Sequence, residues 1–298
     1  MQKFLRNPLQ DDKTLQANFL SKKRGSFYYF RSMCMRMQER FADLMEHEPM
    51  PQVFLHGNPH VENYVITQQG AAMVDFDRAR LGPYAWDLVR FLSSAILKSK
   101  LKTKKLPKLV GEYFLEGYRR SFLMPKVAFK GVGFRASARD TVWFESTNQY
   151  LANGGKWARQ MRANPLKLDH PYLQNALQAY IKQRQDFDLQ EDYFVEEAGQ
   201  ALGTFGNRRF LVVLAPKQAN STDRIFLDLK TVYQDEDNQW YKNPFDHHGE
   251  RMVYASHLYA PRIEQRLAHF TSIGQQYWGR QIPFATAGVK IGRAHVAA

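Results

Sequence analysis

The sequence has few of the features that mark disulfide-rich, membrane-spanning or low-complexity proteins. Its 298 residues include one cysteine, Cys34, which excludes an internal disulfide and is expected to be a small buried apolar residue. A run of about 20 apolar residues and a charged-then-apolar leader are both absent, which predicts no transmembrane segment and a cytoplasmic location. Internal repeats, Gly/Ser-rich linkers and the G-x-S-x-G elbow of a serine hydrolase are also missing.

The composition predicts a folded protein with a strongly basic surface. Hydrophobic residues make up 44% of the chain, which argues against disorder, and the length suits about two domains. The formal net charge is +13, and six lysines fall within the run from Lys98 to Lys108. This run is either a solvated surface or a candidate site for an anionic partner, such as nucleic acid, an anionic lipid surface or an acidic protein.

Two short segments carry the strongest chemical signal. Residues 56–63 read HGNPHVEN, and residues 74–77 read VDFD. A His-Gly turn and an amide-rich loop are followed by an apolar stretch that ends in an acidic pair. This order would let Asn63 and Asp75 reach one Mg²⁺. Magnesium prefers oxygen ligands and commonly bridges nucleotide phosphates.

The two segments resemble the catalytic and metal loops of the protein-kinase-like superfamily, especially its aminoglycoside and choline phosphotransferase branch. The pattern in that branch is HGDxHxxN, then a strand, then IDF or IDW. Residues 77–91 (DRARLGPYAWDLVRF) extend the likeness to a bacterial protein family of unknown function that carries GDxHxxNF, DFDE and GPxxWDLxRL. The resemblance implies an α+β, two-lobed kinase-like fold with ATP and Mg²⁺ as cofactors, and Asn63 and Asp75 as metal ligands.

The chain departs from this pattern at Asn58, where the family has an aspartate that takes the proton of the acceptor hydroxyl. A neutral amide has no basic lone pair at physiological pH. General-base help is worth roughly 10² to 10⁴ in rate, whereas phosphoryl transfer depends mainly on positioning and charge neutralisation. Three interpretations stay open: a natural pseudokinase, an enzyme with another base such as Asp77, or an engineered replacement. Asp77 could also assist a second metal ion.

Further parts of a kinase-like site lie downstream. Residues 202–209 (LGTFGNRR) lead into a run with strong strand propensity, and residues 224–230 (RIFLDLK) alternate like a half-buried strand. These segments look like the glycine loop, hairpin and strand lysine of a nucleotide lobe. The resemblance implies that Lys230 contacts the α and β phosphates and that the loop approaches them through Gly203, Thr204 and Gly206.

A helix over about residues 247–258 should follow the strand lysine. Glu250 is the candidate partner of Lys230, or else an acidic residue that the helix dipole favours in the first turn. Because Lys230 lies 230 − 58 = 172 residues after Asn58, the order of the lobes is reversed, which implies a circular permutation. We expect a helical catalytic and metal-binding lobe over residues 1–190 and a β-rich nucleotide lobe over residues 195–285.

Four other side chains have expected roles near the loop. The resemblance implies that His56 buttresses the backbone and that Asp87 braces the loop by hydrogen bonds. His60 is expected to position the loop. Arg31 is either a phosphate contact, or a surface or ion-pair residue next to an aromatic core cluster.

The sequence therefore predicts an ATP-dependent, phosphotransferase-like protein that modifies a hydroxyl of a small molecule or protein. The alternatives are a catalytically silent nucleotide-binding scaffold, an enzyme that transfers AMP, and a basic nucleic-acid-binding module. The last depends mostly on net charge, because no RNP-like pattern is present.

Overall fold

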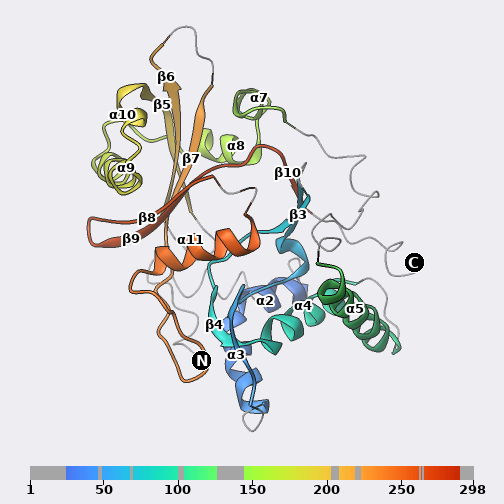
Figure 1. Ribbon diagram of the computed structural model, residues 1–298. Coiled ribbons are helices and arrows are strands. Elements are labelled where there is room, and N and C mark those ends of the chain that lie inside the picture. Colours follow the sequence, from blue (N-terminus) through green and yellow to red (C-terminus); the bar gives the residue numbers. More distant parts are fainter. Residues whose placement is uncertain are drawn as a thin grey trace. The chain divides into compact units, whose positions relative to one another are not determined.

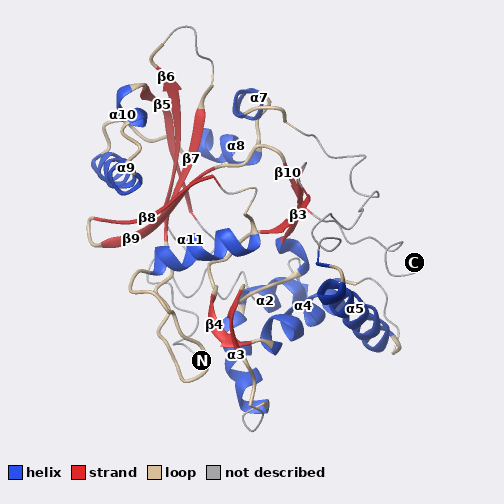
Figure 2. Ribbon diagram, in the orientation of Figure 1, coloured by secondary structure: helices blue, strands red, loops and turns tan. Residues whose placement is uncertain are grey.

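The computed structural model describes residues 25–45, 49–67, 70–99, 104–125, 144–202, 208–218, 223–261, 263 and 265–288. The chain divides into two compact units. The first comprises Met1–Thr141, Asp237–Lys242 and Ala287–Ala298, and the second comprises Val142–Glu236 and Asn243–Thr286. Helices and antiparallel strands occur in both, so the expected α+β class is confirmed (Figure 2).

The first unit combines short strands with helices. Its strands are β1 (Gln52–Leu55), β2 (Tyr64–Thr67), β3 (Gly70–Met73) and β4 (Arg80–Pro83), with β10 (Thr286–Gly288) beside β2. β1 pairs with β4, and β2 pairs with β3, both antiparallel. Its helices are α2 (Gly25–Ser32), α3 (Cys34–Leu44), the 3-10 turn η2 (Val61–Asn63), α4 (Ala85–Lys98) and α5 (Leu106–Leu123).

The core of the first unit joins segments that are far apart in sequence. Cys34 and Phe41 of α3 pack with Leu55, Trp86 and Tyr241. Cys34 is buried, as predicted. Tyr241 lies in the short return segment Asp237–Lys242, which bonds to β4 through Leu81 and Lys242. The first unit is therefore closed by residues that follow the third strand of the second unit.

The second unit is built on a five-stranded antiparallel sheet in the order β5-β6-β7-β9-β8. The strands are β5 (Tyr193–Leu202), β6 (Arg208–Pro216), β7 (Ile225–Thr231), β8 (Gln265–Ser272) and β9 (Gln275–Gln281). The helices are α7 (Thr147–Ala152), α8 (Lys156–Ala163), α9 (Pro171–Arg184), α10 (Asp188–Glu191) and α11 (His248–Tyr259). The predicted strands over 210–214 and 224–230 and the predicted helix over 247–258 are confirmed.

Each face of this sheet packs against different helices. Leu227 and Leu229 of β7 lie in a core with α9, whereas Phe226 lies in a second core with α7 and α8. This is the alternation expected of a strand that is buried on both faces. Figure 1 shows α9 and α10 on one side of the strands and α7 and α8 on the other.

The division between the units differs from the expected lobe boundary near residue 190. The helices α7, α8 and α9 belong to the second unit, because their apolar faces pack on the strands β5 to β9. The pattern of an amphipathic helix shows which face is buried but not which element covers it. None of the described helices combines the length and the hydropathy needed to cross a bilayer.

Candidate functional site

The His-Gly turn of the first unit admits only glycine at residue 57. Gly57 has a φ of +83°, and a Cβ atom there would lie 1.8 Å from the carbonyl oxygen of Arg78. Its own carbonyl accepts hydrogen bonds from Trp86 Nε1 (2.7 Å) and Gln38 Nε2 (3.3 Å). The Cys34 thiol donates to the same carbonyl (3.2 Å), so the turn is fixed by a left-handed backbone, a close approach and three side-chain donors.

Asp87 braces this turn, as predicted. One carboxylate oxygen accepts from the amide of His56 (2.8 Å), and the other accepts from the amide of Gly57 (3.1 Å). Burial raises the pKa of Asp87 to about 7, although both backbone hydrogen bonds act in the opposite direction. The side chain is therefore used to hold the main chain.

The two histidines of the loop are buried and neutral. His56 Nε2 lies 3.0 Å from the carbonyl oxygen of Val74, so its predicted role as a backbone buttress is confirmed. Burial lowers the pKa of His56 to about 4 and that of His60 to about 3. His60 packs its ring against Phe27, with 5.9 Å between the centroids.

Asn58 is a junction between the loop and the N-terminal helices. Its Oδ1 accepts a hydrogen bond from Nε of Arg90 (2.9 Å), and its Nδ2 donates to the carbonyl of Arg31 (3.3 Å). Arg90 is fully buried, donates to the carbonyl of Phe30 (2.7 Å), and lies 3.6 Å from the centroid of the Phe30 ring. The side chain at the predicted catalytic position thus serves as both acceptor and donor in this packing.

The two predicted metal ligands lie on adjoining segments of the first unit. The amide of Val74 donates to the carbonyl of Asn63 (2.8 Å), which extends the β2–β3 pairing toward Asp75. Asn63 is buried, and its Nδ2 donates to the carbonyl of Asn58 (3.2 Å), so its Oδ1 is the atom that a metal ion would use. Asp75 is exposed and has a φ of +71°. A non-glycine residue in this region is uncommon and is often found at functional sites.

The donors of this segment suit a metal that keeps water and substrate oxygens. Asn63 offers a carboxamide oxygen, Asp75 a carboxylate, and Asp77 a second, buried carboxylate. The described residues contain no group of three His, Cys, Asp or Glu side chains that would cage a metal ion. Two or three oxygen donors with open positions fit Mg²⁺ better than a transition metal.

Arg31 forms an ion pair, so the second of its two expected roles is the one observed. The two carboxylate oxygens of Glu62 pair with Nη1 of Arg31 (2.8 Å) and Nζ of Lys98 (2.7 Å). Burial raises the pKa of Glu62, but the hydrogen bond from Lys98 and the charges of Lys98 and Arg31 outweigh it, so the net shift is downward. Lys98, the first lysine of the basic run, is therefore already paired with a carboxylate.

The predicted phosphate-binding lysine lies inside the second unit. Lys230 is buried near the end of β7, opposite Arg209 on β6 and Trp278 on β9. The predicted loop residues Gly203, Thr204 and Gly206 lie outside the described residues. The strands that flank them are paired antiparallel up to Leu202 and Arg208.

Glu250 lies in the first turn of α11, as predicted. Its amide donates to the carbonyl of His247 (3.0 Å). Its pairing with Lys230 stays a prediction.

The sheet of the second unit holds a buried cluster of charged side chains that the sequence analysis did not predict. Asp228 is fully buried, with Nε of Arg209 at 2.9 Å and Nε of Arg280 at 3.5 Å from its carboxylate oxygens. The sequence held one indication of this cluster. Asp228 lies two residues before Lys230, so both side chains must be on the same face of a strand that is buried on both faces. A buried carboxylate needs cationic partners, but the sequence does not say which.

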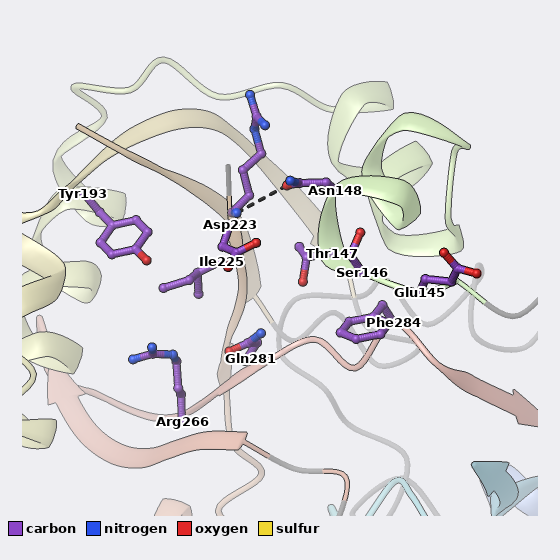
Figure 3. Close-up of a pocket in the computed structure, with 11 residues that line it drawn as sticks. Glu145, Ser146, Thr147, Asn148, Tyr193, Asp223, Ile225, Arg266, Gln281 and Phe284 are labelled. Atoms are coloured by element: carbon purple, nitrogen blue, oxygen red, sulfur yellow. Dashed lines mark hydrogen bonds between the residues drawn. The ribbon is translucent and has the colours of Figure 1, made fainter. Parts of the chain in front are cut away.

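A separate polar pocket lies at the opposite end of β7 from Lys230. Figure 3 shows its lining, which includes Glu145, Asp223, Arg266 and Gln281, around a volume of about 400 Å³. Arg224 lines it too and pairs with Glu196 (2.5 Å), while Arg266 pairs with Asp186 (3.2 Å). The lining thus holds two arginines and two carboxylates, so the pocket has no excess of positive charge.

Comparison with known proteins gives one match. Residues 13–127 are similar to a family model described as "Uncharacterized protein conserved in bacteria (DUF2252)". The match includes residues 56–63 and 77–91 and covers less than half of the chain. No curated protein matches the chain. No solved structure matches it.

Proposed function

We propose that this chain is an ATP-dependent, phosphotransferase-like protein, with metal ligands in the first unit and phosphate-binding residues in the second. Asn63 and Asp75 would hold Mg²⁺, Lys230 would bind the phosphates, and the acceptor is a hydroxyl of a small molecule or protein. The proposed fold is a two-lobed, kinase-like arrangement in circularly permuted order. A cytoplasmic location is part of the same proposal.

The observation that carries this proposal is the backbone hydrogen bond from the amide of Val74 to the carbonyl of Asn63 (2.8 Å), which brings the Asn63 and Asp75 segments together. The resemblance to phosphotransferase loops requires this adjacency of a buried amide and an acidic residue. The second unit adds support, because a hairpin flanks residues 203–207, Lys230 lies on the next strand, and α11 follows with Glu250.

The proposed chemistry needs little from the protein beyond positioning. The acceptor oxygen forms a bond to the γ phosphorus while the bond from that phosphorus to the bridging oxygen breaks. The hydroxyl proton passes to a base, for which Asp77 is the candidate. Bound Mg²⁺ would neutralise charge on the phosphates.

A specific observation favours the catalytically silent scaffold as the second candidate. Both polar atoms of the Asn58 side chain are engaged, by Arg90 and by the carbonyl of Arg31. An aspartate could accept from Arg90 but could not donate to that carbonyl. The amide at residue 58 is thus suited to packing rather than to taking a proton.

Calorimetric titration with ATP, with and without Mg²⁺, tests the proposal when it is paired with turnover assays on Asn58→Asp. A phosphotransferase impaired at residue 58 predicts Mg²⁺-dependent binding and a gain of roughly 10² to 10⁴ in turnover for Asn58→Asp. Asn153→Asp, at the exposed end of α7, is the control for added charge. Binding without turnover in either form favours the scaffold. Binding of RNA without nucleotide binding favours the basic module.

A further inference from the structure

Four charged side chains gather on one face of the central strands of the second unit. Arg209 on β6 lies directly opposite Lys230 on β7, and Asp228 lies directly opposite Arg280 on β9. Asp228 and Lys230 share their face with Phe226, because alternate residues of a strand point the same way. Three cations and one carboxylate thus occupy adjoining positions.

The carboxylate of Asp228 anchors two guanidinium groups. The side chains of Arg209 and Arg280 are 10% and 12% exposed, and that of Asp228 is fully buried. Nε of Arg209 and both oxygens of Asp228 make no well-directed hydrogen bond within the described part of the chain. The contacts are therefore ionic, and they fix the positions of the two guanidinium groups.

Aromatic rings also pack against the same two guanidinium groups. The Arg209 guanidinium carbon lies 4.2 Å from the centroid of a Trp157 ring, and that of Arg280 lies 4.9 Å from Trp278. A planar guanidinium stacks on an aromatic face and loses little freedom when it later binds an oxyanion. Such preorganisation favours ligand binding.

Arg209 and Lys230 place two positive charges directly opposite each other in the sheet. Like charges directly opposite each other in a sheet are destabilising. An anionic ligand converts this repulsion into attraction, and guanidinium forks suit phosphate oxygens. Arg209 is also the second residue of β6, which begins directly after residues 203–207, the segment predicted to approach phosphates.

We propose that Arg209, positioned by Asp228 and Trp157, is a second phosphate-binding cation beside Lys230, and that this face binds a phosphate chain. The proposal rests on the proposed function and deepens it, because it assigns to phosphate binding a residue that the kinase-like resemblance does not name. The pocket of Figure 3 is not this site, since it lies at the other end of β7 and the carboxylates Glu145 and Asp223 are part of its lining.

Calorimetric titrations with ATP, inorganic tripolyphosphate and adenosine test this role. Arg209→Gln is expected to weaken ATP and tripolyphosphate by about 10- to 100-fold, the range of a charged hydrogen bond, and to leave adenosine binding unchanged. Arg209→Lys keeps the charge but loses the fork, so an intermediate loss is expected. Arg162→Gln, which removes a surface partner of Glu197, is the control for lost charge.

The outcomes separate the two proposals. If the unaltered protein binds ATP, and folded Arg209→Gln and Arg209→Lys bind ATP and tripolyphosphate equally well, the role of Arg209 is wrong while the proposed function stands. If the unaltered protein binds tripolyphosphate through Arg209 but does not bind adenosine or ATP, the anion site stands and the nucleotide proposal is wrong. If it binds none of the three ligands, both proposals fail.

Discussion

The two units hold their buried charged groups in different ways. Around the His-Gly turn of the first unit, polar side chains bond to the main chain, as Asp87 does to two amides and His56 to the carbonyl of Val74. On the sheet of the second unit, Asp228 meets two guanidinium groups instead. The first arrangement fixes the backbone, whereas the second fixes the positions of two cations.

This difference indicates which buried charges serve the fold and which are suited to a ligand. A carboxylate whose oxygens accept backbone amides has little capacity for further partners. Two arginines that share one carboxylate carry more positive charge than it neutralises. Substitutions of these groups should therefore affect stability in the first unit, and both stability and anion binding in the second.

The largest effect is expected for Gly57→Ala. Its φ of +83° and the 1.8 Å approach to the Arg78 carbonyl leave no room for a methyl group, so the loss should be of order 5 kcal/mol or more. Gly274→Ala is the matched control, because its φ is +69° but nothing lies within 4 Å of the added atom. It should cost about 1–2 kcal/mol from backbone strain alone. Urea unfolding measures both, and equal losses would contradict the close approach.

The next largest effect is expected for Asp228→Asn. Removing the charge leaves Arg209 and Arg280 buried without their carboxylate, which should cost about 3–5 kcal/mol in the free energy of unfolding. Replacing all three residues by apolar ones of similar volume should cost much less, because the carboxylate and both of its guanidinium partners are then removed together. The triple variant should at the same time lose tripolyphosphate binding. A stable single variant would show that the cluster is hydrated.

Acidic titration should separate the contributions of His60 and Asp87, which have opposite signs. The pKa of His60 falls from 6.5 to about 3 on folding, so the unfolded chain binds more protons and stability falls as pH falls below 6.5. The pKa of Asp87 rises from 3.8 to about 7, so stability falls as pH rises through this range. His60→Gln should therefore lower the slope of unfolding free energy against pH by about 1.4 kcal/mol per unit, and Asp87→Asn should raise it equally. The free energy of unfolding of both variants, measured between about pH 4.5 and 6, checks the two changes in slope. If both variants changed the slope in the same direction, the burial of His60 and Asp87 described above would be contradicted.

The smallest effect is expected for Glu62→Gln. Its ion pairs with Arg31 and Lys98 join side chains that are 33–43% exposed, so the loss should stay below about 1 kcal/mol. The effect should shrink further at high salt, where surface charges are screened. Thermal unfolding at low and high salt measures it. A larger, salt-independent loss would place this triad with the buried groups.

Local sequence accounts for much of the first unit's site. The bracing role of Asp87 and the buttressing role of His56 follow from a compact motif, and both are observed. The hydrogen bonds of the Asn58 side chain could not be predicted from this motif, because its partner Arg90 lies on the buried face of α4, one turn after Trp86. A motif identifies residues in a loop but not the packing partners that a helix brings to it.

Pairing between distant strands accounts for what the sequence did not reveal in the second unit. Strand propensity and alternation predicted β6 and β7, whereas the neighbours of Asp228 depend on the register of β6, β7 and β9. The unit boundary was misplaced for a similar reason. Amphipathic spacing in α9 predicts a buried face, but the sheet that covers it is assembled from residues after 190.

The most direct test of the central claim is the affinity for Mg-ATP of Asp75→Asn and Lys230→Gln, measured by calorimetry on folded protein. Both variants are expected to bind at least about tenfold more weakly, since each removes a charged contact. For Asp75→Asn the loss should disappear when Mg²⁺ is omitted, whereas for Lys230→Gln it should persist. Unchanged affinity in both variants, with the same response to Mg²⁺ as the unaltered protein, would contradict the claim that these residues bind metal and phosphate.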